Sequence, residues 1–181
     1  MSSEMLQRIV LVGFMGAGKS SVGRALASRL SWRFEDLDEA LVRRSGRSID
    51  TWFREKGEAA FRAEEDALAQ VLLVEHGLVL ASGGGWATQE GRLAELPAGT
   101  MSIWLDVDAD EAVRRVKADS VYRPLLGGSE AEKEARRLLD LRRDAYGSAD
   151  LRVDTNGHSV EDVTSRILEI LENAGTRIEA E

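Results

Sequence analysis

Residues 13–20, Gly-Phe-Met-Gly-Ala-Gly-Lys-Ser, have the residue types and the spacing of a phosphate-binding loop, G-x-x-x-x-G-K-[ST]. Glycines let the backbone turn tightly enough for successive N–H groups to point at a phosphate. Lys19 would then reach the β- and γ-phosphate oxygens of a nucleotide, and the hydroxyl of Ser20 would ligate Mg²⁺. The alternative, an incidental glycine-rich turn, is disfavoured because a buried strand pattern precedes the motif and a helical pattern follows it.

Two aspartates follow the second predicted strand at a spacing that could serve phosphoryl transfer. Asp36 and Asp38 are two residues apart, and in an extended segment this spacing places both carboxylates on one side. One could complete the magnesium shell while the other accepts a proton from an attacking hydroxyl. The alternative is that the two acids cap and charge the first turn of a helix that begins at Leu37. The phosphate loop upstream favours the catalytic interpretation.

Three consecutive glycines, residues 83–85, follow the buried strand pattern of residues 78–82. Ligands bind outside the carboxyl ends of the strands in open α/β sheets. The glycines could therefore bring backbone N–H groups close to a ligand. A flexible turn is the alternative.

An anionic small substrate would need locally placed arginines, because the net charge of the chain is −8. Arg62 lies three residues before Glu65 on a predicted helix and can pair with it, although such pairs commonly lie on the surface. Arg123 lies in the irregular stretch 118–129, whose Arg-Pro and Gly-Gly pairs predict a mobile loop that closes over a site. Arg123 is then the candidate to meet a transferring phosphate. A plain exposed loop is the alternative.

The elements that would position these residues alternate between strands and helices. Short apolar runs predict five strands, and apolar residues spaced three or four apart predict helices between them. This alternation predicts a parallel α/β sheet that is covered on both faces. The strands are predicted at residues 8–12, 32–36, 78–82, 101–105 and 151–154, and the helical patterns at 21–30, 43–58 with a break, 58–73, 88–96, 106–117, 130–146 and 159–172.

The length and composition of the chain exclude several classes of protein. A chain of 181 residues predicts one domain, and its net charge of −8 leaves no basic stripe for a nucleic acid. The absence of cysteine excludes disulfides and thiolate metal sites and is typical of a reducing cytosol. No apolar run approaches the about 18 residues that cross a bilayer, and residues 1–7 lack the pattern of a secretion signal. We therefore expect a cytoplasmic monomer that binds neither nucleic acid nor membrane.

Taken in order, the motifs resemble the shikimate kinase family, whose members phosphorylate the 3-hydroxyl of shikimate with ATP. The resemblance covers the chain from about Arg8 to Leu171. It implies a three-layer α/β/α P-loop fold with a five-stranded parallel sheet. It also implies a single kinase domain over residues 1–181, with a substrate-binding helical region at about 37–66 and a mobile lid at about 118–129. The motifs are G-x4-G-K-S at 13–20, Asp36-Leu37-Asp38, Gly46-Arg47-Ser48-Ile49 followed by Phe53, Phe61-Arg62-x-x-Glu65, Gly83-Gly84-Gly85, Arg123-Pro124-Leu125-Leu126 and Leu139-x-x-Arg142-x-x-x-Tyr146.

The resemblance also implies roles for individual residues. Asp36 and Ser20 would support Mg²⁺, and the catalytic residues would be Lys19, Asp38 as the base, and the lid arginine Arg123. Trp86 stands where the family usually has a small residue, so that it either narrows the site or packs beside it. Shikimate would contact Asp38, Arg62, Gly84, Gly85 and Arg142, with both arginines on its carboxylate and Glu65 orienting Arg62. ATP would contact Gly16, Ala17, Gly18, Lys19, Ser20, Ser21, Arg115 and Arg123. The apolar wall would consist of Ile49, Phe53, Phe61, Pro124 and Leu125.

Three other interpretations are open to the same sequence. Another small-metabolite kinase, such as a gluconate kinase, would share the loop and the acids but would not need the three glycines with Arg62 and Arg142. A nucleotide-dependent switch would be expected to carry a guanine-reading N-K-x-D motif, and the sequence has none. A catalytically dead relative is disfavoured because Lys19, Asp38 and Arg123 are all present.

Overall fold

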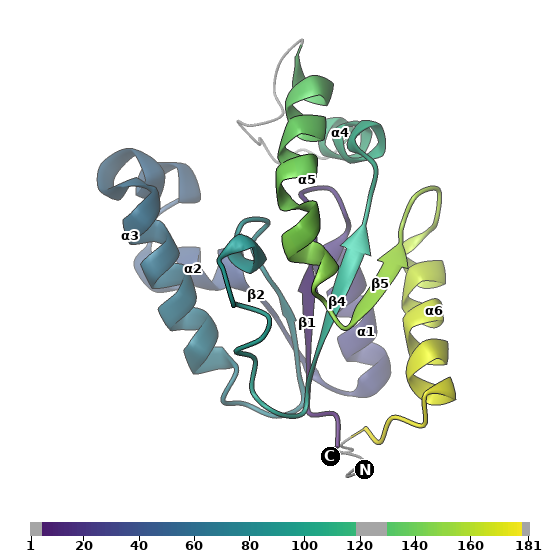
Figure 1. Ribbon diagram of the computed structural model, residues 1–181. Helices are drawn as coiled ribbons and strands as arrows, with labels where there is room; N and C mark the ends of the chain where they lie inside the picture. The colour runs from purple at the N-terminus through teal and green to yellow at the C-terminus, as the bar shows by residue number, and fades with distance from the viewer. Residues whose placement is uncertain (1–4, 119–129, 179–181) are drawn as a thin grey trace.

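The computed structural model of the protein describes residues 5–118 and 130–178. Its described part contains a five-stranded parallel sheet in the order β2-β3-β1-β4-β5, surrounded by six helices (Figure 1). The predicted α/β class and the five parallel strands are confirmed. The strands are β1 (Arg8–Val12), β2 (Arg33–Asp36), β3 (Leu78–Ala81), β4 (Thr100–Asp106) and β5 (Leu151–Asp154). The helices are α1 (Lys19–Leu30), α2 (Leu37–Ser45), α3 (Ile49–Leu72), α4 (Ala109–Ala118), α5 (Ala131–Gly147) and α6 (Val160–Asn173), and a 3₁₀ turn, η1, spans Trp86–Thr88.

Strand β1 is the central strand, and all five of its residues are buried. It pairs in parallel with β3 and β4, so that Val10 lies between Leu80 and Ser102. In a parallel sheet the carboxyl ends of the strands meet at one edge. The phosphate loop, the two aspartates and the three glycines follow the ends of β1, β2 and β3, and the topology therefore gathers them at that edge.

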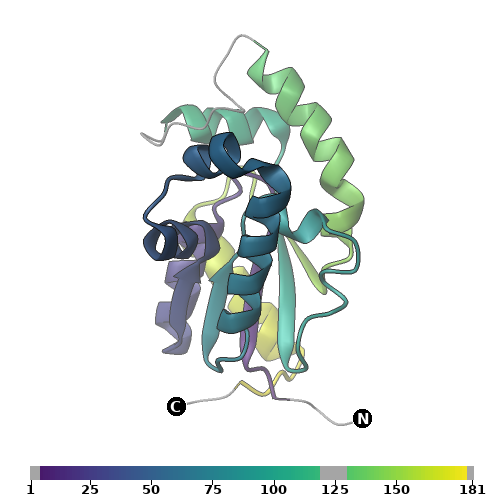
Figure 2. The ribbon, with the colours of Figure 1, turned by 90° about the vertical axis from the view of Figure 1, so that its left-hand side faces the viewer.

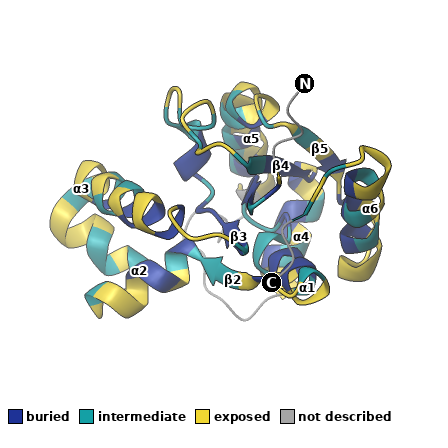
Figure 3. Cartoon of the chain, turned by 90° about the horizontal axis from the view of Figure 1, so that it is seen from below, coloured by how far each residue is buried: buried dark blue, intermediate teal, exposed yellow. Residues whose placement is uncertain are grey.

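Helices cover both faces of the sheet and bury most of its three central strands, β3, β1 and β4. Helices α1 and α6 pack against each other on one side of the strands, and α3 and α5 lie on the other side (Figure 3). The turn η1 contacts both α3 and α5. Two perpendicular views agree that α4 and α5 lie at the end of the molecule where the strands finish (Figures 1 and 2). This is the same end as the predicted site.

One predicted helix is absent. Residues 88–96 were expected to be helical, but only η1 and a series of turns follow the three glycines. Gly91 has a φ of 75°, in the left-handed region, and an α-helix cannot continue through it. The break expected at Ser45-Gly46 is confirmed, because α2 ends at Ser45 and Gly46 has a φ of 68°. Gly57, which precedes the next predicted helix, adopts non-helical angles of φ 79° and ψ 169° inside α3.

The predicted lid lies almost entirely outside the described residues. Helix α4 ends at Ala118, and residues 119–129, which include Arg123, Pro124 and Leu125, are not part of the description. Within the described residues, every helix is too short or too polar to cross a lipid bilayer.

Candidate active site

The phosphate loop connects β1 to α1 and depends on its glycines. Gly16 and Gly18 have positive φ angles of 78° and 92°. A Cβ atom on Gly16 would lie 2.7 Å from the carbonyl oxygen of Ala112, so no larger residue fits there. Nζ of Lys19 donates hydrogen bonds of 2.9 Å to the carbonyl oxygens of Gly13 and Phe14, which folds the lysine over its own loop.

The loop leads into the amino end of α1. Lys19, Ser20 and Ser21 form its first turn, where backbone N–H groups have no intrahelical acceptor. The helix dipole adds positive potential at this end. The residues from Gly16 to Ser21, which are predicted to bind ATP, therefore lie in one continuous segment at a helix end whose N–H groups and dipole suit an anion.

Asp36 connects this loop to the second strand. Its Oδ2 accepts a hydrogen bond of 2.5 Å from the hydroxyl of Ser20, and its Oδ1 accepts bonds from the backbone N–H groups of Asp38 and Glu39. Asp36 is therefore both the N-cap of α2 and the neighbour of the predicted magnesium ligand, so the two interpretations of this acid are compatible.

Asp38 does not lie in an extended segment, and the geometric argument that placed both carboxylates on one side is wrong. Helix α2 begins at Leu37, so Asp38 occupies its first turn. A Cβ atom on Gly83 would lie 3.0 Å from Oδ1 of Asp38. The two aspartates thus have different neighbours: Asp36 bonds Ser20 at the end of the phosphate loop, and the Asp38 carboxylate lies beside Gly83.

Arg62 and Glu65 form a buried ion pair rather than a surface one. Nη1 of Arg62 lies 2.7 Å from Oε2 of Glu65, whose side chain has no exposed surface. Burial raises the pKa of the Glu65 carboxyl from its ordinary 4.5 to about 7, the charge of Arg62 opposes this rise, and the charge of Asp38 adds to it. Oε1 of Glu65 is buried with no hydrogen-bond partner, and it faces the same small volume beside Gly83 as Asp38.

Arg62 also lies against a glycine and two aromatic rings. A Cβ atom on Gly85 would lie 2.7 Å from Cζ of Arg62, closer than side-chain carbons approach, so only glycine allows the guanidinium to sit there. Cζ of Arg62 lies 5.2 Å from the ring centre of Phe61 and 6.0 Å from that of Phe53. The two rings are 4.7 Å apart and form the apolar side of this position.

Arg142 reaches the neighbouring glycine from the opposite helix. Its Nη1 donates a hydrogen bond of 3.2 Å to the carbonyl oxygen of Gly84. A Cβ atom on Gly84 would lie 3.8 Å from the carbonyl oxygen of Gly13. The predicted substrate arginines, from α3 and α5, therefore converge on consecutive glycines beside the phosphate loop.

Tyr146 is a site residue to which the sequence assigned no role. Its hydroxyl donates to the same Gly84 carbonyl at 2.5 Å, and its side chain is fully buried. Burial raises the pKa of Tyr146 above its ordinary value, although the charge of Arg142 opposes this, so the hydroxyl remains a donor. The available signal was its spacing of four residues from Arg142, which places both side chains on one face of α5.

Arg115 joins the phosphate loop to the segment after β5. Its Nη1 donates 3.2 Å bonds to the carbonyl oxygen of Gly16 and to Oγ1 of Thr155, and its Nη2 bonds the Thr155 carbonyl. Nε lies 2.8 Å from Oε1 of Glu111. Hydrogen bonds from Arg114 and then Arg115 lower the pKa of Glu111 to about 2, which keeps that carboxylate charged.

Trp86 packs beside the site rather than narrowing it. Its side chain is 1% exposed and belongs to the buried core. The guanidinium of Arg92 lies over its ring at 5.5 Å.

Known proteins resemble this chain over most of its length. The family model described as shikimate kinase matches residues 15–172. A shikimate kinase from Synechococcus sp. (strain RCC307) is 43% identical over 163 residues, which cover 90% of this chain and 83% of the relative. The solved structure of a shikimate kinase from Acinetobacter baumannii in complex with shikimate superposes with a TM-score of 0.87 at 34% identity, covering 94% of this chain and 96% of that one.

The rival small-metabolite kinase is a more distant match. A gluconokinase from Sinorhizobium meliloti has a TM-score of 0.60 at 18% identity, a likeness that extends to the fold alone. The family model and the relatives above cover most of the chain. The chain belongs to the shikimate kinase family.

Proposed function

We propose that this enzyme transfers the γ-phosphoryl group of ATP to the 3-hydroxyl of shikimate, giving shikimate 3-phosphate and ADP, and that the residues described above carry out the transfer. One observation supports the assignment of residues most strongly. Arg62 on α3 and Arg142 on α5 converge on Gly85 and Gly84, next to the phosphate loop. An anionic acceptor held there would present a hydroxyl to a phosphate in the loop.

The phosphates of ATP would lie along the loop and the first turn of α1. Lys19, which rests on two loop carbonyls, would exchange these bonds for the β- and γ-phosphate oxygens. Arg115, already fixed to Gly16 and Thr155, would contact the base end of the nucleotide.

The residues present fit a magnesium ion. Ser20 and Asp36 place two hard oxygen donors 2.5 Å apart, and such oxygens suit Mg²⁺. The described residues contain no cluster of three or more acidic, histidine or cysteine side chains that could hold a metal. When bound, Mg²⁺ would neutralise charge on the transferring phosphate.

Shikimate would be held by its carboxylate. Guanidinium groups bind carboxylates through two parallel hydrogen bonds, which suits Arg62 and Arg142. The paired Glu65 would hold Arg62 in orientation, and Phe53 and Phe61 would cover the apolar part of the ring.

Asp38 would orient the 3-hydroxyl and accept its proton as the oxygen attacks the phosphorus in line with the leaving ADP. Closure of the lid, residues 118–129, would exclude water and bring in Arg123. One placed arginine contributes roughly 10³–10⁵ in rate in related phosphoryl transfers. Residues 37–66 would form the substrate-binding region of a single kinase domain over residues 1–181. The monomeric state, the cytoplasmic location and the lack of nucleic-acid binding remain predictions.

Release of ADP from ATP tests the proposed function. The assay compares shikimate, quinate, gluconate and nucleoside monophosphates as acceptors at matched concentration. We expect shikimate alone among these acceptors to accelerate the release of ADP. Acceleration by any of the other three classes without shikimate would contradict the proposal.

A further inference from the structure

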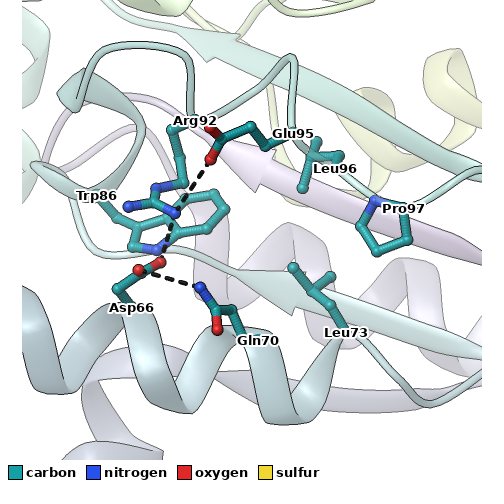
Figure 4. A pocket seen from close by; sticks show the side chains of 8 residues that line it. All are labelled: Asp66, Gln70, Leu73, Trp86, Arg92, Glu95, Leu96 and Pro97. Atoms are coloured by element: carbon teal, nitrogen blue, oxygen red, sulfur yellow. Dashed lines mark hydrogen bonds and ion pairs between the residues drawn. The ribbon is translucent and has the colours of Figure 1, made fainter.

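Arg92 and Asp66 form an ion pair between α3 and the segment that follows the three glycines. Nη1 of Arg92 lies 2.5 Å from Oδ1 of Asp66, and the two side chains are only 14% and 22% exposed. The pair lies at a cavity of about 140 Å³ between these two parts of the chain (Figure 4). None of the roles assigned above uses either residue.

Arg92 is also fixed to its own segment. Its Nη2 donates a 3.0 Å hydrogen bond to Oε1 of Gln89, and its guanidinium lies 5.5 Å from the ring centre of Trp86. Figure 4 shows Arg92 between Glu95 and Asp66, close to the Trp86 ring. One side chain therefore connects helix α3, the 3₁₀ turn and the turns that replace the predicted helix.

The ion pair joins the same two parts of the chain as the contact between Arg62 and Gly85 in the substrate site. Asp66 directly follows Glu65 and lies four residues, about one helical turn, after Arg62. Trp86, which Arg92 covers, directly follows Gly85. The guanidinium of Arg62 lies so close to Gly85 that a Cβ atom there would collide with it. A small shift of α3 against this segment would therefore open or close the position where Arg62 meets its ligand.

We propose that the Arg92–Asp66 ion pair is a positioning device for the substrate, which holds α3 against the three glycines so that Arg62 keeps its place for the shikimate carboxylate. Arg92 and Asp66 are positioning residues, since neither reaches the site itself. This inference rests on the proposed function, because it assigns to Arg62 the binding of the carboxylate.

The charge of Arg92 adds a second effect on the same site. The groups that act on Glu65 are Arg62 on its own helix, Asp38 on α2 and Arg92 from the loop, and Arg92 lowers the pKa of Glu65. Removing the charge of Arg92 would raise that pKa further. Glu65 would then be protonated at a higher pH and would hold Arg62 less firmly.

Steady-state kinetics of Arg92→Met, Asp66→Asn and the double variant test the proposal. We expect each single substitution to raise the shikimate KM roughly tenfold, while the ATP KM stays within about twofold of the wild-type value. The shikimate KM of the double variant should not exceed that of the more impaired single variant, because the effects of substituting two residues in contact do not add. Arg92→Lys keeps the charge and should recover part of the affinity. In Arg92→Met, the pH below which the shikimate KM rises should also move upward.

A matched control comes from an exposed pair of the same chemistry. Arg136 and Asp110 lie 3.0 Å apart with side chains 65% and 70% exposed, and we expect Arg136→Met to leave the shikimate KM unchanged. An unchanged shikimate KM in Arg92→Met, or an equal rise in the ATP KM, would overturn the positioning role. Arg62→Lys, measured beside it, separates the two proposals. If Arg62→Lys raises the shikimate KM and Arg92→Met does not, only the positioning role fails, whereas a silent Arg62→Lys removes the proposed carboxylate site itself.

Discussion

The hydroxyl of Ser20 donates a 2.5 Å hydrogen bond to Oδ2 of Asp36, the same carboxylate whose other oxygen caps helix α2. One side chain thus connects the phosphate loop to the start of the predicted substrate-binding region. Its structural role and its proposed metal role belong to different oxygens. Substitutions can therefore separate them.

Asp36→Asn should keep the helix cap and lose the metal site. Asparagine caps a helix about as well as aspartate, so the free energy of unfolding should change little, whereas turnover at limiting Mg²⁺ should fall by about 10²-fold or more. Asp36→Ala should lose the cap as well, at a cost of about 1 kcal/mol. Urea denaturation beside the ADP assay measures both effects, and normal turnover in Asp36→Asn would remove this residue from the metal site.

Asp38→Asn should separate chemistry from binding. Loss of a general base lowers the rate by roughly 10²–10⁴, while the amide can still hold the 3-hydroxyl by a hydrogen bond. We expect kcat to fall by this factor and the shikimate dissociation constant to change far less. Near-normal turnover would exclude Asp38 as the base.

Tyr146→Phe should weaken shikimate binding without unfolding the core. The phenyl ring fills the same volume, but Arg142 would remain as the described side-chain donor to the Gly84 carbonyl. Loss of one partner in a buried hydrogen bond costs about 1–3 kcal/mol, and we expect the shikimate KM to rise more than the ATP KM. Equal changes in both would show that Tyr146 serves the fold as a whole.

Glu65 should make stability depend on pH. Its pKa is raised from 4.5 to about 7, so between these values the folded protein binds more protons than the unfolded chain. The contribution of Glu65 to the free energy of unfolding is therefore fully present below about pH 4.5 and is lost as the pH rises through about 7. Denaturation at several pH values should show this loss in the wild type and not in Glu65→Gln. If the free energy of unfolding depends on pH in the same way in the wild type and in Glu65→Gln, the raised pKa of Glu65 is contradicted.

Most of the fold could be predicted because its signals are local. The apolar runs around Val10 and Leu80 predicted buried strands, and Ser45-Gly46 predicted the break at which α2 ends. The helix expected at residues 88–96 failed because the sequence does not reveal that Gly91 adopts a positive φ. What holds that segment is the pairing of Arg92 with Asp66, a contact made across the fold.

The candidate site was predictable to the level of residue types but not of their contacts. The spacing of Arg62 and Glu65 was equally compatible with a surface pair, since the burial of Glu65 depends on Gly83, which packs against it from another part of the chain. Arg142 and Tyr146 both donate hydrogen bonds to the carbonyl oxygen of Gly84, about 60 residues away in the sequence. A pattern of neighbouring residues cannot predict contacts over such a distance.

The central claim is that Arg62 and Arg142 select a carboxylate, and the ratio of kcat/KM for shikimate to that for its neutral carboxamide tests it most directly. The carboxamide has nearly the same shape but no charge. We predict that the wild type prefers shikimate by roughly 10²-fold, and that Arg142→Ala reduces this preference at least about tenfold while leaving the ATP KM nearly unchanged. The claim is contradicted if the wild type has the same kcat/KM for shikimate and for the carboxamide. It is also contradicted if Arg142→Ala lowers kcat/KM by the same factor for both acceptors.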